Sequence, residues 1–84
     1  MYIQSLQPTL IKHNSTLNVV ANTANNILVK VLDTNGNIAK TIEKAVNEGR
    51  QELSLNLSDL AKGNYVLNAF TNGIFLKSIR FVKH

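Results

Sequence analysis

The residues of this chain that could perform acid–base or nucleophilic chemistry are few and lie apart in the sequence. Asp33 and Asp59 each stand among turn-forming residues, whereas a catalytic carboxylate pair needs a shared pocket and shifted pKa values. Capping of a turn accounts for each aspartate without catalysis. Ser58 has no histidine partner in a recognisable motif, so the sequence predicts no nucleophile. These residues favour a protein that is not an enzyme.

Residues that could hold a metal, a phosphate or a cofactor are equally scattered. The two histidines, His13 and His84, have no carboxylate at a metal-ligand spacing, and the first falls in an expected loop. The glycines stand singly in expected turns, unlike those of a phosphate-binding loop; they are Gly36, Gly49, Gly63 and Gly73. The sequence therefore predicts no metal site and no cofactor.

Composition limits the classes of partner. A chain of 84 residues is expected to form one domain, residues 1–84, and without cysteine it has neither a disulfide nor thiol chemistry. The formal net charge is +4, but the basic residues are scattered and no aromatic residues interleave with them, so nucleic-acid binding is not predicted. No run of about 20 apolar residues predicts a membrane span, and no basic-then-apolar secretory leader opens the chain.

The segment from Leu53 to Tyr65 is the one around which the expected fold is arranged. Leucines alternate with polar residues up to Leu57, which predicts a strand with one buried face. The next two residues break the alternation, and Leu60 then supplies one large apolar side chain that should plug an end of the core. Gly63 followed by Tyr65 at the start of a strand is typical of the tyrosine corner of β-sandwiches, in which the hydroxyl bonds to upstream backbone. A helical turn with a glycine cap is the alternative, but the segment is too short for a stable helix.

Alternating apolar runs separated by turn signals predict seven strands and no helix. The expected strands are Tyr2–Leu6, Thr16–Val20, Ile27–Leu32, Ile38–Ala45, Arg50–Leu57, Tyr65–Phe70 and Ile74–Val82. Loops are expected at Lys12–Ser15 and Ala21–Asn26, and a turn at Val46–Gly49. Seven short strands at this spacing are typical of an antiparallel Ig-like β-sandwich.

Two Asn-Gly pairs mark the expected hairpins. Asn35-Gly36 and Asn72-Gly73 should each form a tight turn in which both residues have positive φ. The strand Ile38–Ala45 should lie at a sheet edge, guarded by lysine and glutamate. On the other strands, Leu32, Val66 and Phe70 should either point outward as an apolar patch or fill the ends of the sheets.

Three stretches resemble the C-terminal sorting domain of Bacteroidetes cargo proteins that the type IX secretion system exports. The first is Val29–Gly36, a strand followed by Asp33, two further residues and Gly36. The second is Leu57–Tyr65, with Leu60, Gly63 and Tyr65, and the third is the basic-apolar ending Lys77–Lys83. In order and spacing the resemblance covers residues 16–84. The family commonly opens with a Tyr-Pro-Asn-Pro-like motif, where this chain has Leu6-Gln7-Pro8-Thr9 and only Pro8 agrees. The N-terminal boundary within residues 1–15 therefore stays open.

The resemblance implies a non-catalytic signal in the form of a folded domain. Such domains are recognised by the type IX outer-membrane translocon and usually removed by a surface sortase, and the cargo is often passed to a lipopolysaccharide anchor. The implied location is the periplasm in transit to the outer membrane and cell surface. A carbohydrate-binding or adhesion module of a secreted enzyme is the alternative, but such modules usually present a row of exposed aromatic residues. This chain has five aromatic residues and no tryptophan.

The last strand is the expected place for contact with a partner. The candidate recognition residues are Lys62, Lys77, Arg80, Phe81 and Lys83, of which Phe81 is also expected in the core. The basic side chains could form a rim facing an acidic surface, and the strand could add its backbone edge to a partner sheet. Equally, lysine on a border strand protects against aggregation. Weak pairing of two copies through border strands is a further expectation.

Overall fold

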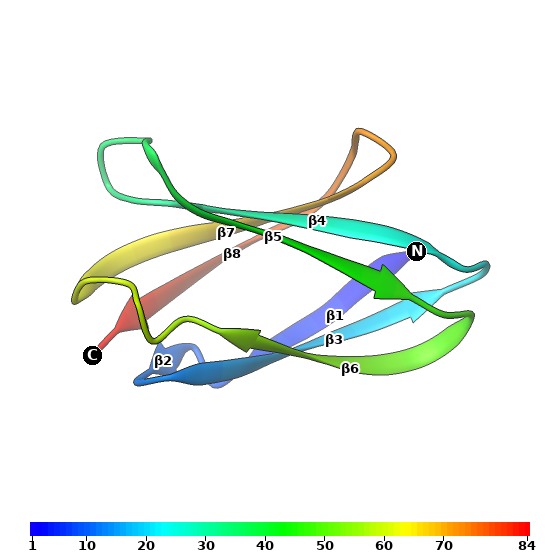
Figure 1. Ribbon diagram of the computed structural model, residues 1–84, viewed down its shortest axis with the longest axis horizontal. Helices are drawn as coiled ribbons and strands as arrows, with labels where there is room; N and C mark the ends of the chain where they lie inside the picture. Colours follow the sequence, from blue (N-terminus) through cyan, green and yellow to red (C-terminus); the bar gives the residue numbers. More distant parts are fainter.

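Two β-sheets face each other in the computed structural model, which describes residues 1–84 (Figure 1). The strands are β1 (Tyr2–Gln7), β2 (Leu10–Ile11), β3 (Asn14–Ala21), β4 (Asn25–Leu32), β5 (Ile38–Val46), β6 (Gly49–Asn56), β7 (Gly63–Thr71) and β8 (Ile74–Lys83). One sheet has the order β1-β3-β6 and the other the order β2-β8-β7-β4-β5. The all-β, Ig-like sandwich is confirmed, with eight strands instead of seven.

The additional strand, β2, comes from the N-terminal segment. After Pro8 the chain leaves the sheet that holds β1, and Leu10–Ile11 pairs in parallel with Val82 and Lys83 of β8 in the other sheet. All other strand pairs are antiparallel. Two residues are too few to show an alternating pattern, so the sequence could not reveal this strand.

The predicted loop Lys12–Ser15 is wrong in its second half, because Asn14 and Ser15 already belong to β3. Ser15 is buried, and its hydroxyl donates to the carbonyl of Pro8 at 2.6 Å. A polar side chain can occupy an inward strand position when it has such a partner. The other connections are also shorter than predicted, since Ala21 and Val46 are buried final residues of their strands.

Alternation of apolar residues correctly identifies the buried face of each long strand. The inward residues Ile27, Val29 and Val31 of β4 are fully buried, as is Leu67 of β7. They pack against side chains of the opposite sheet, among them Leu17, Val19 and Leu55. Burial of this apolar surface is the main stabilising contribution to a sandwich without disulfides.

Only one of the two predicted Asn-Gly turns is confirmed. Asn72 and Gly73 both have positive φ, at 50° and 75°, as a two-residue hairpin requires. In the β4–β5 turn only Gly36 has positive φ, at 82°. Here a carboxylate oxygen of Asp33 accepts the N–H groups of Asn35 (2.9 Å) and Asn37 (3.0 Å). The aspartate therefore stabilises a longer turn that competes with the tight one.

Gly63 begins β7 with a φ of +151°, a value that side chains with a Cβ rarely adopt. Nothing lies within 4 Å of an added Cβ, so the backbone alone opposes substitution. We expect Gly63→Ala to lower the free energy of unfolding by about 1 kcal/mol, measured by chemical denaturation. The control Asn64→Ala, at an exposed neighbour, should change it by less than about 0.5 kcal/mol. Equal stability of the two variants would contradict a constraint at Gly63.

Candidate functional site

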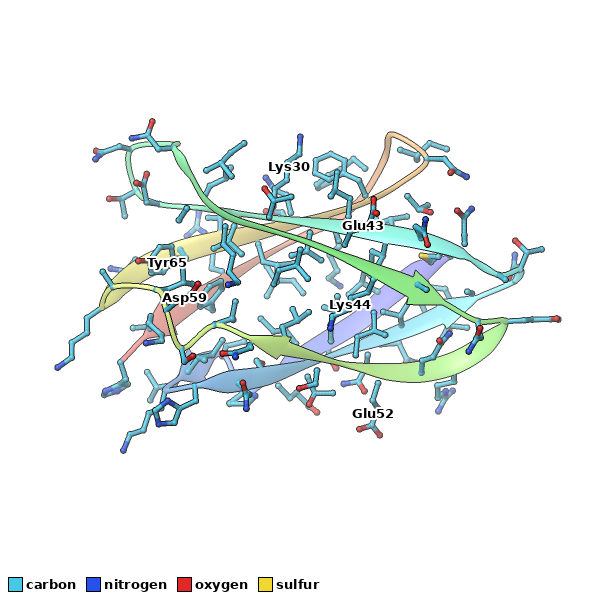
Figure 2. All side chains as sticks on the ribbon, viewed as in Figure 1. Lys30, Glu43, Lys44, Glu52, Asp59 and Tyr65 are labelled. Atoms are coloured by element: carbon cyan, nitrogen blue, oxygen red, sulfur yellow. The ribbon has the colours of Figure 1, made fainter.

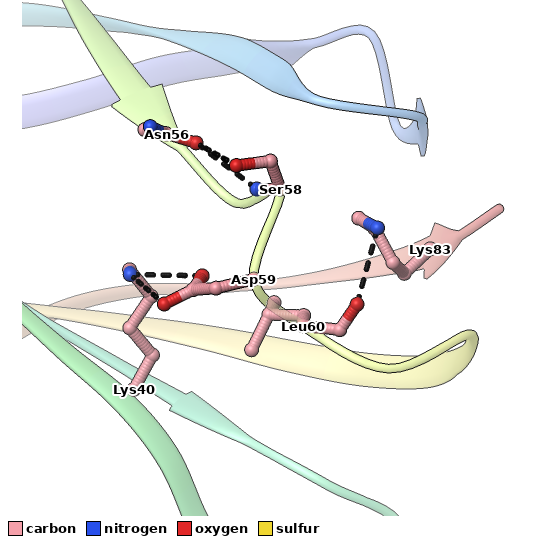
Figure 3. Close-up of polar contacts among 6 residues, drawn as sticks. All are labelled: Lys40, Asn56, Ser58, Asp59, Leu60 and Lys83. Carbon is pink, nitrogen blue, oxygen red and sulfur yellow. Dashed lines mark hydrogen bonds and ion pairs between the residues drawn. The ribbon is translucent and has the colours of Figure 1, made fainter.

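The crossing, residues Leu57–Lys62, carries the chain from β6 to β7 and closes one end of the sandwich (Figures 1 and 3). The N–H of Leu57 donates to the carbonyl of His13 at 2.7 Å, and the N–H of Leu60 donates to the carbonyl of Leu57 at 3.2 Å. Both leucines are buried in the core. The crossing is therefore held to the β2–β3 connection by its backbone and to the core by two side chains. The prediction that Leu60 fills one end of the core agrees with its burial.

The tyrosine corner is confirmed. The hydroxyl of Tyr65 donates to the carbonyl of Ala61, four residues upstream, at 2.6 Å. The ring of Tyr65 stacks on Phe81 of β8, with centroids 5.4 Å apart and planes inclined by 18°. Figure 2 shows Tyr65 at the end of the sandwich where the crossing meets β7. The crossing contains no helix, so the alternative of a helical turn is not what the structure has.

Two of the candidate recognition residues lie in the interior instead of on a rim. Phe81 is a core residue. Lys83 is only 7% exposed, and its ammonium group donates to the carbonyl of Leu60 at 3.1 Å (Figure 3). Lys83 lies on the inward face of β8, paired with Gly63, which has no side chain of its own. The sequence reasoning missed this role because the contact with Leu60 joins residues far apart in the chain.

The exposed basic residues of β8 point to opposite faces of the sheet. Lys77 pairs with Ala69, whose side chain faces the core, and Arg80 pairs with Val66, whose side chain faces outward. Paired residues of antiparallel strands share a face. Lys62 is exposed at the end of the crossing. The five candidates therefore do not form one continuous basic rim.

The two aspartates have separate partners and separate structural roles. Asp33 stabilises the β4–β5 turn, whereas both carboxylate oxygens of Asp59 lie near the ammonium group of Lys40, at 2.8 and 3.0 Å (Figure 3). The hydrogen bond and the charge of Lys40 hold the pKa of Asp59 below its ordinary value of 3.8. This ion pair links β5 of the five-stranded sheet to the crossing.

Removal of Lys40 should raise the pKa of Asp59 toward its ordinary value. Because the pKa of Asp59 is lowered in the folded protein, the pair stabilises the fold at neutral pH, and this contribution is lost as pH falls through the folded-state pKa. The side chain of Asp59 is 66% exposed, so the effect on stability should be small. An NMR titration of the Asp59 carboxyl in Lys40→Met, with Lys44→Met as the control on the same strand, measures the change. An identical titration curve in wild type and Lys40→Met would contradict the pairing.

The two histidines come together, which the sequence did not predict. His13 and His84 line one small pocket, together with Lys12, Ser58, Lys62 and Lys83. No group of three or more His, Cys, Asp or Glu side chains that could hold a metal occurs in the structure. The site is therefore a basic pocket rather than a metal-ligand cluster.

The outer face of the five-stranded sheet carries half-buried apolar side chains, as predicted for Leu32, Val66 and Phe70. Leu32 and Val66 are cross-strand neighbours. Phe70 packs edge-on against Phe75, with centroids 5.7 Å apart, and the ammonium group of Lys30 lies 5.4 Å from the centroid of its ring. Figure 2 shows Lys30 on this side of the sheet. A hollow of about 550 Å³ lies beside the patch, lined in part by Val66, Arg80 and Val82.

One edge of β8 is only partly paired. The N–H groups of Val82 and His84 donate to the carbonyls of Thr9 and Ile11, at 2.8 and 2.7 Å. Because alternate residues of a strand point their N–H groups to the same side, those of Ser78 and Arg80 also face this edge. The short strand β2 pairs only with Val82 and Lys83, so no strand is hydrogen-bonded to the edge beside Ser78 and Arg80.

The structure contains no helix with the length and apolar character needed to cross a membrane. Comparison with known families matches residues 13–83 to the secretion system C-terminal sorting domain. Neither the curated proteins nor the solved structures gave a match. The matched residues include the crossing, the tyrosine corner and all of β8. The resemblance is thus confirmed, and the chain belongs to the family of type IX secretion C-terminal sorting domains.

Proposed function

We propose that the folded sandwich is itself the export signal, which the type IX outer-membrane translocon binds at the end of a cargo protein. The family match over residues 13–83 carries this proposal. A role without chemistry is consistent with the structure, because the two aspartates and the buried tyrosine have structural partners. Asp33 stabilises a turn, Asp59 pairs with Lys40, and the hydroxyl of Tyr65 bonds to the backbone.

The fate of the cargo is proposed by analogy with the family. The cargo would pass through the periplasm and the outer membrane to the cell surface. A surface sortase would then cut the domain off and pass the cargo to a lipopolysaccharide anchor. The single core between the two sheets fits a signal that must stay folded until the translocon has bound it, since a small domain with one core unfolds cooperatively.

The open edge of β8 is the contact surface we propose for the translocon. Its unpaired N–H groups at Ser78 and Arg80 can donate to the carbonyls of an extended partner segment, which would then join the sheet as an additional strand. Arg80 and Lys77 are exposed along the same strand and can attract an acidic partner from either face. Lysine at an edge also discourages pairing between copies of the domain. Recognition of a partner and protection against aggregation are therefore compatible roles for these residues.

A carbohydrate-binding module gains no support from the aromatic side chains. Tyr65 and Phe81 are buried against each other, and Phe70 is half-buried. The most exposed rings, Tyr2 and Phe75, are each 55% exposed but belong to strands of different sheets. They form no row on which sugar rings could stack.

Export of a reporter tests the sorting function. A periplasm-targeted reporter fused to residues 1–84 should reach the cell surface or medium of a bacterium that has the type IX machinery. The reporter without the domain, or with a domain that lacks residues 77–84, should stay in the periplasm. Retention of the complete fusion, or normal export of the shortened one, would overturn the sorting proposal.

A pair of variants at Ser78 tests the contact surface separately. Ser78→Pro removes the N–H that faces the open edge and keeps the pairing with β7, since proline is tolerated at strand edges. Export should be largely lost in Ser78→Pro and unchanged in the matched control Ser78→Ala, which keeps the N–H. Normal export of a folded Ser78→Pro fusion would place the contact elsewhere and leave the sorting function standing.

A further inference from the structure

A basic pocket lies where the crossing, the β2–β3 connection and the end of β8 meet. It is an open depression of about 270 Å³, lined by Lys12, His13, Ser58, Lys62, Lys83 and His84. No Asp, Glu or apolar side chain lines it. Figure 3 shows Ser58 and Lys83 on the crossing and on β8, with the Lys83 ammonium group turned toward the crossing.

Backbone and side-chain hydrogen bonds hold the walls of this pocket in place. The carbonyl of His13 accepts the N–H of Leu57 at 2.7 Å, and the N–H of His84 donates to the carbonyl of Ile11 at 2.7 Å. The N–H and hydroxyl of Ser58 both donate to the side-chain oxygen of Asn56, at 3.0 and 2.6 Å. The lining residues therefore come from separate segments that are already joined, which reduces the entropy lost when a ligand binds.

Lys83 is a buried cation that belongs to no close ion pair. Its ammonium group has three N–H donors, and the only hydrogen bond it makes is to the carbonyl of Leu60. The one ion pair of the structure joins Lys40 to Asp59 of the crossing; the charge of Lys83 acts on this carboxylate more weakly, without a direct contact. A charge removed from water is costly unless an opposite charge compensates it. The remaining donors of Lys83 are thus available for an anion in the pocket that it lines.

We propose that this pocket binds a phosphate dianion, either free or as the terminal monoester of a larger molecule. Three lysines supply positive charge from three segments, and the histidines add ring donors. A volume of about 270 Å³ is large enough for a tetrahedral oxyanion with part of its hydration. The site is separate from the open edge of β8 at Ser78 and Arg80, so it does not depend on the proposed sorting contact.

NMR titration of the ¹⁵N-labelled domain with inorganic phosphate, at neutral pH and with ionic strength held constant by sodium chloride, tests the site. Saturable shifts should be confined to the amides of the pocket residues. Lys12→Gln and Lys62→Gln change exposed side chains and should each weaken binding by about fivefold or more. The matched control Lys44→Gln removes the same charge from an exposed position on β5 and should leave the affinity unchanged.

A parallel titration with glycerol 3-phosphate distinguishes the two sources of the anion. Equal affinities support recognition of the phosphate group alone, and tighter binding of the monoester supports the end of a larger molecule. Shifts that never saturate, that spread over all the lysines, or that weaken equally in Lys62→Gln and Lys44→Gln would overturn the proposal.

Discussion

Replacement of Leu60 by alanine should lower the free energy of unfolding by about 3 kcal/mol. Leu60 is the only large apolar side chain in the middle of the crossing, and it is 8% exposed within the core cluster. Two hydrogen bonds hold the backbone of the crossing. The N–H of Leu57 donates to the carbonyl of His13, and the carbonyl of Leu60 accepts from the ammonium group of Lys83. The crossing cannot readily collapse into the space left by the lost methyl groups, so both burial and packing are lost.

Chemical denaturation monitored by circular dichroism measures this change. A domain of 84 residues has a total stability of about 5–10 kcal/mol, so Leu60→Ala should remove a large share of it. Leu10→Ala is the matched control, because Leu10 is 58% exposed, and it should change stability by less than about 0.5 kcal/mol. If the two variants were equally stable, Leu60 would not plug the core.

Replacement of Tyr65 by phenylalanine should lower the free energy of unfolding by about 1–3 kcal/mol. The substitution keeps the ring, and with it the stacking on Phe81, and removes only the hydroxyl that donates to the carbonyl of Ala61. That hydrogen bond fixes the entry of the chain into β7 from the crossing. Its loss leaves a carbonyl without its partner at a partly buried position, which is the costly case for a hydrogen bond.

Tyr2→Phe provides the control for the loss of a phenolic hydroxyl. Tyr2 is 55% exposed, and its hydroxyl stays in water, so its removal should not change the unfolding midpoint. A double variant, Tyr65→Phe with Leu60→Ala, would show whether the two residues act together. They lie in one short segment, so we expect their effects to be non-additive. An unchanged midpoint in Tyr65→Phe alone would contradict a stabilising tyrosine corner.

The seven longer strands and their buried faces were predictable because the signal for them is local. Alternation in β4, β6 and β7 reports which side chains meet the opposite sheet, and the register follows once one face must be buried. The tyrosine corner was predictable for the same reason, since Leu60, Gly63 and Tyr65 lie within six residues of one another. The type of the Asn72-Gly73 turn also follows from two adjacent residues.

At Asn35-Gly36 two local signals in the sequence favour different turns. The same dipeptide that forms a tight turn between β7 and β8 sits in a longer turn between β4 and β5. The difference lies in Asp33, whose carboxylate accepts two backbone N–H groups. The sequence contains both signals, but it does not show which hydrogen bonds are favoured once the two strands are paired in register.

The candidate sites depend on contacts between distant parts of the chain. The local pattern placed Lys83 on an exposed rim, but the pairing of β2 with β8 and the path of the crossing bury it beneath the carbonyl of Leu60. The basic pocket joins residues 12–13, the crossing and the last two residues, and no spacing in the sequence indicates that they meet. The periodicity of side chains in the sequence determines which face of a strand is buried. Which charged residues come together is decided only when the ends and edges of the sheets pack in the tertiary structure.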